Sequence, residues 1–278
     1  MQKDFVSISA VSTIKQVGEI AEIVQKEDLP FQVVIGYQLS NKSINQGTQN
    51  LRQPKFVELR DLDRETKSYG LTTALHYFTK DNQTVVSDLE KIVRLGINPN
   101  LTLLQLNTLP LETENLVRIK DMGFKIILPV AVSNKKDGGY AIWKGEGVQD
   151  VNSGEVEPLL EQVRERAKVI DYVLFDPSHG TNLELNLNEE SLAVKFGRGI
   201  INEKRTKSLG LVYAGGIKPE NVKELGKTLR GFFTKGVSID VESGVRTDDF
   251  LDLKKVRDYL VGYQENDALP QPKGRGLK

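Results

Sequence analysis

Residues 213–222 read YAGGIKPENV, and this stretch decides how the chain folds around it. It follows the apolar run 209–212 and precedes the helical pattern that starts at 223–225. Gly215 and Gly216 allow backbone N–H groups to approach an anion without a Cβ in the way, and a helix start behind them offers unpaired donors and a positive dipole end. The stretch predicts a strand, a phosphate-binding turn and a helix in succession.

Strand-like and helix-like segments alternate along the whole chain, which favours a parallel sheet built from βα units. The clearest helical patterns are 86–96, 155–167 and 250–260. Eight strands predict a single-domain (β/α)₈ TIM barrel, although a doubly wound sheet remains an alternative because spacing alone does not prove closure. The candidate strands are 5–9, 31–39, 71–78, 101–106, 125–132, 172–176, 209–213 and 237–241.

The composition excludes several classes of protein. The 278 residues contain 38 lysines and arginines against 38 aspartates and glutamates, so no overall field attracts nucleic acid or an acidic membrane. The chain has no cysteine, which excludes disulfides and thiolate metal sites, and no apolar stretch near the ~20 residues of a membrane span. Its first residues lack a signal-peptide pattern. We therefore expect a cytoplasmic protein without nucleic-acid or membrane partners.

Two long connections and a polar tail interrupt the regular pattern. Residues 40–70, after the second strand, suggest one irregular helix, and residues 133–154, after the fifth, suggest a glycine-rich loop. Connections of this length are usually lids, binding loops or mobile insertions, and in a barrel both lie at the carboxyl ends of the strands. The tail 265–278 is expected to be disordered, which leaves a barrel domain over 1–264.

A second glycine turn follows the last candidate strand. Ser243 and Gly244 come directly after 237–241, and an acidic helix start follows at 247–249. In a barrel the ends of strands seven and eight are neighbours that often hold one phosphate between them. Either turn alone is an ordinary tight turn, but the two together predict a site for one phosphate group.

These motifs resemble the C-terminal quarter of the phosphoribosylanthranilate isomerase family, a tryptophan-biosynthesis barrel. A thinner similarity extends upstream, where Asp176 precedes the pair Gly180 and Thr181, and Asn107 stands where the family has a histidine. The resemblance implies an Amadori-type aldose–ketose isomerisation of a small phosphorylated sugar. The segments that carry it most strongly are 214–216, 219–222, 240–241, 243–245 and 252–257.

The resemblance also implies residue roles. Asp176 matches the general acid, which requires a pKa raised well above about 3.9, for example by burial. The alternative is an ionised Asp176 that caps a turn. Phosphate would be held by backbone and hydroxyl groups at Gly180, Thr181, Gly215, Gly216, Ser243 and Gly244.

The general base is the main departure from the family. Ser9 occupies the position of the family's strand-one cysteine, and a hydroxyl is a far weaker acid than a thiol and needs its own base. His179 and His76 are the only histidines, and either could replace the thiol because imidazole titrates near neutrality. His179, next to the Gly180 turn, is the preferred candidate, whereas His76 is more simply read as a polar group in the barrel interior.

The group attached to the sugar is not fixed by the sequence. The family places an arginine after strand two against the ring carboxylate, and Lys42, Arg52 or Arg60 could supply that charge here. Tyr140 and Trp143 could stack on an aromatic group.

Three function classes follow: a phosphosugar isomerase, another phosphosugar epimerase, lyase or aldolase, or a catalytically silent phosphate-ligand binder. No histidine–carboxylate cluster has a metal-ligand spacing, so neither a metal nor another cofactor is expected. The oligomeric state is left open.

Overall fold

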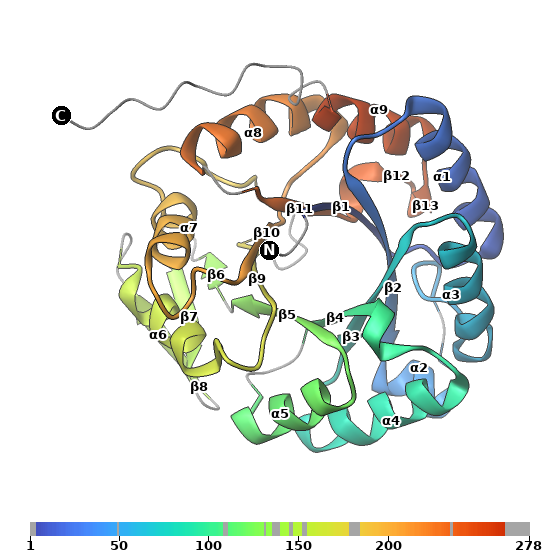
Figure 1. Ribbon diagram of the computed structural model, residues 1–278, viewed down its shortest axis with the longest axis horizontal. Coiled ribbons are helices and arrows are strands. Elements are labelled where there is room, and N and C mark those ends of the chain that lie inside the picture. The colour runs from blue at the N-terminus through green and yellow to red at the C-terminus, as the bar shows by residue number, and fades with distance from the viewer. Residues whose placement is uncertain are drawn as a thin grey trace.

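The chain forms a closed barrel of eight parallel strands surrounded by helices (Figure 1). This computed structural model describes residues 4–48, 50–107, 111–130, 132–134, 140–144, 147–151, 155–177, 184–233 and 236–264. The strands follow the order β1-β11-β10-β9-β5-β4-β3-β2. Closure confirms the (β/α)₈ barrel and rules out the doubly wound sheet. The barrel strands are β1 (Phe5–Ser9), β2 (Gln32–Ser40), β3 (Thr72–Phe78), β4 (Thr102–Leu106), β5 (Lys125–Val130), β9 (Tyr172–Phe175), β10 (Gly210–Tyr213) and β11 (Ser238–Val241).

Helices cover the outside of the barrel, and each buries one apolar stripe against the strands. In α1, for example, Val17, Ile20 and Ala21 are buried at helical spacing, and Thr13 with Gln16 forms a capping box at its start. The α-helices are α1 (Ile14–Glu27), α2 (Asn41–Gln46), α3 (Leu59–Ser68), α4 (Val85–Leu95), α5 (Thr113–Asp121), α6 (Glu157–Arg166), α7 (Leu192–Asn202), α8 (Pro219–Phe232) and α9 (Leu253–Gln264). Four short 3-10 turns complete the described helical structure: Phe56–Glu58, Asn82–Thr84, Pro99–Leu101 and Ser243–Val245.

Two apolar cores follow from the alternation of side chains along each strand. The larger core lies between strands and helices, and Val6 and Ile8 of β1 belong to it. The smaller core fills the barrel interior, where Phe5 packs edge to face against Tyr172. Towards the carboxyl ends of the strands the inward positions turn polar, as at Ser9. The barrel therefore has an apolar floor and a polar mouth.

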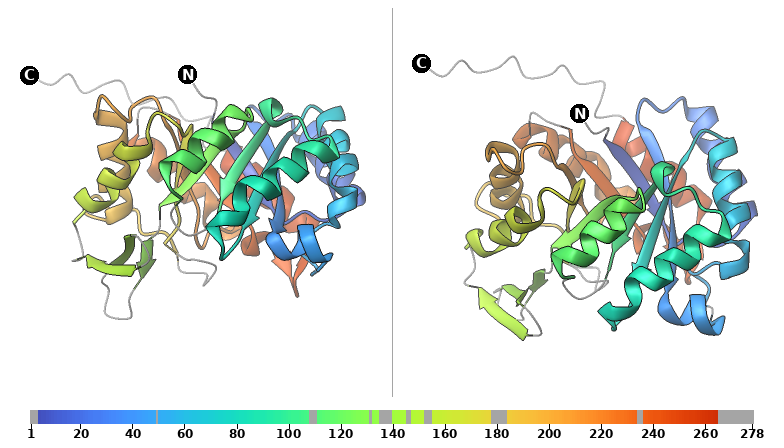
Figure 2. Two further views of the ribbon diagram at one scale, coloured as in Figure 1. Left: turned by 90° about the horizontal axis from the view of Figure 1, so that it is seen from below. Right: turned by 60° about the horizontal axis from the view of Figure 1, so that its bottom comes forward.

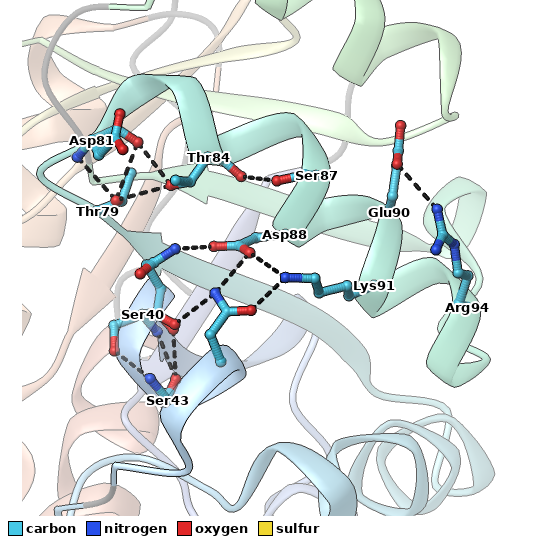
Figure 3. A network of polar contacts seen from close by, with 12 residues as sticks. Ser40, Ser43, Thr79, Asp81, Thr84, Ser87, Asp88, Glu90, Lys91 and Arg94 are labelled. Atoms are coloured by element: carbon cyan, nitrogen blue, oxygen red, sulfur yellow. Dashed lines mark hydrogen bonds and ion pairs between the residues drawn. The ribbon is translucent and has the colours of Figure 1, made fainter.

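The connection after β2 contains two helices, α2 and α3, where one irregular helix was expected. A network of hydrogen bonds fixes α2 (Figure 3). The carboxylate of Asp88 on α4 accepts from Asn41 at 2.7 Å and Asn45 at 2.9 Å, both on α2. Tyr77 of β3 and Lys91 of α4 also donate to it. The extra helix is thus held by long-range contacts that its own polar sequence does not signal.

The connection after β5 was expected to be a loop, but it contains a three-stranded antiparallel sheet. Its strands are β6 (Val132–Asn134), β7 (Tyr140–Lys144) and β8 (Gly147–Val151), in the order β6-β7-β8. Figure 2 shows this sheet and α2 at the same end of the barrel, opposite the end where β1 begins. Both long connections therefore lie at the mouth, as predicted.

The last helix begins later than its periodicity predicts. Phe250 and Leu251 form β13 (Phe250–Leu251), which pairs antiparallel with β12 (Arg246–Thr247). The turn between them places Asp248 and Asp249 at positive φ, and Asp252 then accepts from the first amides of α9. Residues 265–278 lie outside the described residues, so the disordered tail and the domain bounds 1–264 stay predictions. None of the helices in the described ranges is both long and apolar enough to cross a bilayer.

Candidate functional site at the barrel mouth

The two glycine turns predicted to share a phosphate lie against each other at the mouth. They follow β10 and β11, which pair in the barrel. Gly215 and Gly216 have φ values of +105° and +61°, a region that side-chain-bearing residues seldom adopt. A Cβ on Gly244 would overlap the carbonyl oxygen of Ile217, so glycine is required for this close approach. The chain thus brings both turns to one place.

Helix α8 begins directly behind the first turn. Pro219 occupies its first turn, and the Asn221 side chain ties its start by accepting from Lys218 N at 2.9 Å and donating to Gly216 O at 2.9 Å. The Lys218 ammonium reaches Glu184 at 2.8 Å on the surface. A helix N-terminus with a fixed entry and glycines before it is a suitable surface for an anion.

Below the turns, a buried polar cluster occupies the barrel interior. The Ser9 hydroxyl donates to Asp240 Oδ1 at 2.5 Å and lies 3.4 Å from His76 Nε2. Ser7 Oγ is 3.5 Å from Ser9 Oγ. A Cβ on Gly36 would lie 2.7 Å from Ser9 Oγ and 2.9 Å from His76 Nε2, so this glycine leaves the space that the cluster fills.

Asp240 is the buried acid of this cluster. Burial raises the pKa of its carboxyl group, while His76 and the hydroxyls of Ser9 and Ser7 act in the opposite direction. The carboxylate form is therefore disfavoured by desolvation and partly restored by its neighbours. With burial as the largest of these influences, the pKa of the Asp240 carboxyl lies above its ordinary value, which makes its carboxylate a stronger base.

An ion-pair network spans the rim above the cluster. Glu242 accepts from Gln38 Nε2 at 2.7 Å and from Arg52 Nη1 at 2.7 Å. Arg52 also contacts Asp249, with Nε at 3.1 Å. Of the three basic candidates in the connection after β2, Arg52 is the one that these contacts hold at the mouth. Lys42 is exposed, and the side chain of Arg60 is 63% exposed beside Asp61.

Comparisons with known proteins point to one family. Residues 142–261 match the family model described as N-(5'phosphoribosyl)anthranilate (PRA) isomerase. An N-(5'-phosphoribosyl)anthranilate isomerase of Clostridium acetobutylicum is 24% identical over 157 residues, covering 53% of this chain and 67% of that protein. The C-terminal part of the chain is thus similar to the phosphoribosylanthranilate isomerase family.

A second N-(5'-phosphoribosyl)anthranilate isomerase, from Acetivibrio thermocellus, is 39% identical over 58 residues, which is 21% of this chain and 24% of that protein. Among solved structures, the phosphoribosylanthranilate isomerases of Thermotoga maritima and Pyrococcus furiosus each superpose with a TM-score of 0.58 at 15% identity. Each superposition covers 94% of this chain and 99% of the other. At this identity the structural match shows the shared barrel fold.

Asp176, the predicted general acid, directly follows β9 and is half-buried. A general acid that stays protonated was expected to be buried, but the described residues enclose Asp176 only in part. His179, Gly180 and Thr181 lie outside the described residues, so their predicted roles stay predictions. Tyr140 and Trp143 lie on β7, but their side chains are outside what the structure describes.

Sequence reasoning assigned no role to two carboxylates that the structure brings to the mouth. Asp240 and Glu242 occupy alternate positions on and just after β11, the alternation that carries side chains to one face of a strand. This alternation was the feature of the sequence that could have indicated a shared role for the two carboxylates. It could not show that Ser9, 231 positions earlier, would meet Asp240. His76, interpreted mainly as a polar interior group, is buried in the interior beside Ser9.

Proposed function

We propose that this chain catalyses the aldose–ketose isomerisation of N-(5'-phosphoribosyl)anthranilate. The observation that carries the proposal is the close contact of the turns at Gly216 and Gly244, which lies within the stretch that matches the family. The phosphate of the substrate would accept hydrogen bonds from backbone groups at Gly215, Gly216 and Gly244 and from the Ser243 hydroxyl. Gly180 and Thr181, which lie outside the described residues, remain predicted phosphate contacts. The substrate class is then a small phosphorylated sugar, handled in the cytoplasm.

Asp176 is the proposed general acid. Its proton passes to the oxygen of the ribose ring as the bond from carbon 1 to that oxygen breaks, and the nitrogen lone pair forms an iminium bond to carbon 1. A base then removes the proton from carbon 2, and the resulting enol collapses to the ketone. Asp176 recovers its proton from the hydroxyl on carbon 2, so the reaction consumes no cofactor.

Arg52 is the proposed contact for the anthranilate carboxylate. It is the basic group held at the rim by Glu242 and Asp249, and a guanidinium binds carboxylates in a planar, bidentate manner. Glu242 and Asp249 would share Arg52 with the incoming carboxylate. Substrate binding thus involves a rearrangement of this network.

A catalytically silent phosphate binder is the second candidate, and one observation favours it. Ser9 stands in the place of the family's thiol and is fully buried. A buried hydroxyl alone does not remove a proton from carbon. If no other group acts as the base, the chain would bind the phosphorylated sugar without turning it over.

The test combines growth and binding. The native chain is expressed in a tryptophan auxotroph that lacks the isomerase, and the purified protein is assayed for consumption of N-(5'-phosphoribosyl)anthranilate. The isomerase function is supported if the native chain restores growth and turns over the substrate, and if the Asp176→Asn substitution abolishes both. Binding of ribose 5-phosphate in a calorimeter without growth supports the silent binder or a different phosphosugar enzyme. If the protein supports no growth and binds no ribose 5-phosphate, the proposal is wrong.

A further inference from the structure

The proposed isomerisation needs a base, and Ser9 is poorly suited to act as one itself. Its residue surface is fully buried, so a substrate at the mouth does not reach it in this arrangement. Its hydroxyl proton is already directed at Asp240 Oδ1, 2.5 Å away. A hydroxyl carries a single proton, so towards His76 Nε2 at 3.4 Å Ser9 offers only lone pairs. Ser9 therefore links its two neighbours.

Asp240 is the most exposed member of the cluster. It retains 8% exposure, against 4% for His76 and none for Ser9. It lies on β11, whose following turn carries Ser243 and Gly244 of the proposed phosphate site. A sugar anchored by its phosphate at that turn places its reacting carbons close to the end of the same strand.

We propose that Asp240 is the catalytic base and that Ser9 and His76 are positioning residues that hold its carboxylate. This inference rests on the proposed isomerase function and departs from the thiol base that the family resemblance implies. The Ser9 hydroxyl fixes one carboxylate oxygen, and the space left by Gly36 allows Ser9 and His76 to approach each other. The other carboxylate oxygen is then the proton acceptor.

The proton transfers balance. After ring opening, Asp240 takes the proton from carbon 2, and the electron pair of that bond forms the double bond between carbons 1 and 2 while the iminium pair returns to nitrogen. Asp240 next delivers the proton to carbon 1 as the hydroxyl on carbon 2 loses its own proton to Asp176. Both carboxyl groups end in their starting states, and no oxidant or reductant is involved.

The environment of Asp240 suits this task. Burial raises the pKa of its carboxyl, which strengthens the carboxylate as a base. The groups that face it are Ser7 and Ser9 on β1, His76 on β3 and Glu242 beyond its own strand, with Tyr259 of α9 near enough to have its own pKa raised in part by Asp240. Of these, Ser9 and Ser7 donate hydrogen bonds that favour the carboxylate.

The test compares Asp240→Asn with Ser9→Ala in the full chain. Asp240→Asn should lower kcat by about 100- to 10,000-fold, the usual contribution of a general base. Its affinity for ribose 5-phosphate should stay within about threefold, since the phosphate turn is intact. Ser9→Ala should retain turnover within roughly tenfold, because the base remains. Equal losses in the two variants, or full turnover in Asp240→Asn, overturn the inference.

A pH profile supplies a second readout that does not depend on the Asp240→Asn variant folding. The rising limb of kcat/KM reports ionisation of the base in the free enzyme. Ser9→Ala removes a hydrogen bond that lowers the pKa of Asp240, so this limb should move to higher pH. A limb that stays in place contradicts the inference.

Asp88→Asn is the matched control. Asp88 is another buried aspartate, but it lies on α4 outside the barrel, so kcat per folded molecule should be unchanged. Absence of turnover in the unsubstituted protein would instead remove the isomerase function, which keeps the two failures distinct.

Discussion

Gly244 illustrates how one residue fixes the candidate phosphate site. Its backbone lies so close to the carbonyl of Ile217 that no side chain fits between the two turns. The contact partner is backbone, which cannot rotate away as a flexible side chain would. The close approach of the two turns therefore depends on the missing Cβ at this position.

Gly244→Ala should push the turns apart and weaken phosphate binding. We expect at least a tenfold loss of affinity for ribose 5-phosphate by calorimetry and, because the clash is with backbone, destabilisation of about 1–3 kcal/mol. Gly231→Ala is the control at the far end of α8, where a Cβ meets open space. It should raise stability slightly, by about 0.5–1 kcal/mol, and leave binding unchanged. Equal behaviour of the two variants would contradict the packing argument.

Asp240 makes a testable contribution to the pH dependence of stability. Its folded pKa lies above the unfolded value of about 3.9, so the folded state holds the proton more tightly. The stability of the native chain relative to Asp240→Asn should therefore fall as the pH rises above about 4, and level off once the pH exceeds the folded pKa. Urea unfolding of both proteins between pH 4 and pH 8 measures this difference. A constant difference would show that burial does not perturb this carboxyl group.

At the scale of elements, Asp88 joins the helices α2 and α4 to the strand β3. Its carboxylate accepts hydrogen bonds from side chains of α2 and of its own helix α4 (Figure 3). It also accepts one from Tyr77 of β3. Burial raises its pKa, but the hydrogen bonds from Asn45, Tyr77, Asn41 and Lys91 together bring it below the ordinary value. The short helix α2 buries only Ser43 and Ile44, so the hydrogen bonds from its asparagines to Asp88 supply much of its attachment to the barrel.

Asp88→Ala should release α2 and destabilise the barrel. Loss of several buried, charge-assisted hydrogen bonds is expected to cost about 2–4 kcal/mol in urea unfolding. Amide hydrogen exchange over residues 41–46 should rise more than in α1. Glu90→Ala is the control on the same helix, since its pair with Arg94 is exposed and contributes less than about 0.5 kcal/mol. Unchanged exchange in α2 would show that Asp88 does not anchor it.

At the scale of the whole molecule, barrel closure places distant segments side by side at the mouth. Arg52, from the connection after β2, meets Glu242 and Asp249, 190 and 197 positions away in the sequence. These side chains are about a third to a half exposed, so the network contributes little to stability. Its position above the buried cluster is more relevant to what the mouth binds.

Arg52→Gln should therefore alter binding more than folding. We expect KM for N-(5'-phosphoribosyl)anthranilate to rise by about 10- to 100-fold through loss of a charge-assisted contact, with stability changed by less than about 1 kcal/mol. Affinity for ribose 5-phosphate, which lacks the carboxylate, should not change. Arg60→Gln, in the same connection but exposed, should leave KM unaltered. A rise for both ligands would place Arg52 at the phosphate instead.

Much of the site was accessible from sequence, but its chemistry was not. The turns at Gly215 and Gly244 could be predicted because tight turns need particular residues in a short stretch. Asp240 lies in a segment that carries the family resemblance, but no feature of the sequence was a reason to assign it a role. Its partners Ser9 and His76 come from other strands, which only the fold brings next to it. His76 allowed two interpretations until its neighbour was known. The late start of α9 was also missed, because the β12–β13 pairing competes with a helical pattern that extends to Phe250.

The sequence by itself determined the eight strands of the sheet and the two glycine turns, because hydrophobic periodicity and turn chemistry are local properties of the chain. It favoured a barrel, but closure of the sheet was shown by the structure. Only the tertiary structure decided which inward side chains meet. Strand register in the closed sheet places Ser7 opposite Asp240 and Gly36 opposite Ser9, and it thereby brings Ser9 to Asp240 and His76. Register is a property of pairing between distant strands, so the local pattern that predicts each strand does not specify it.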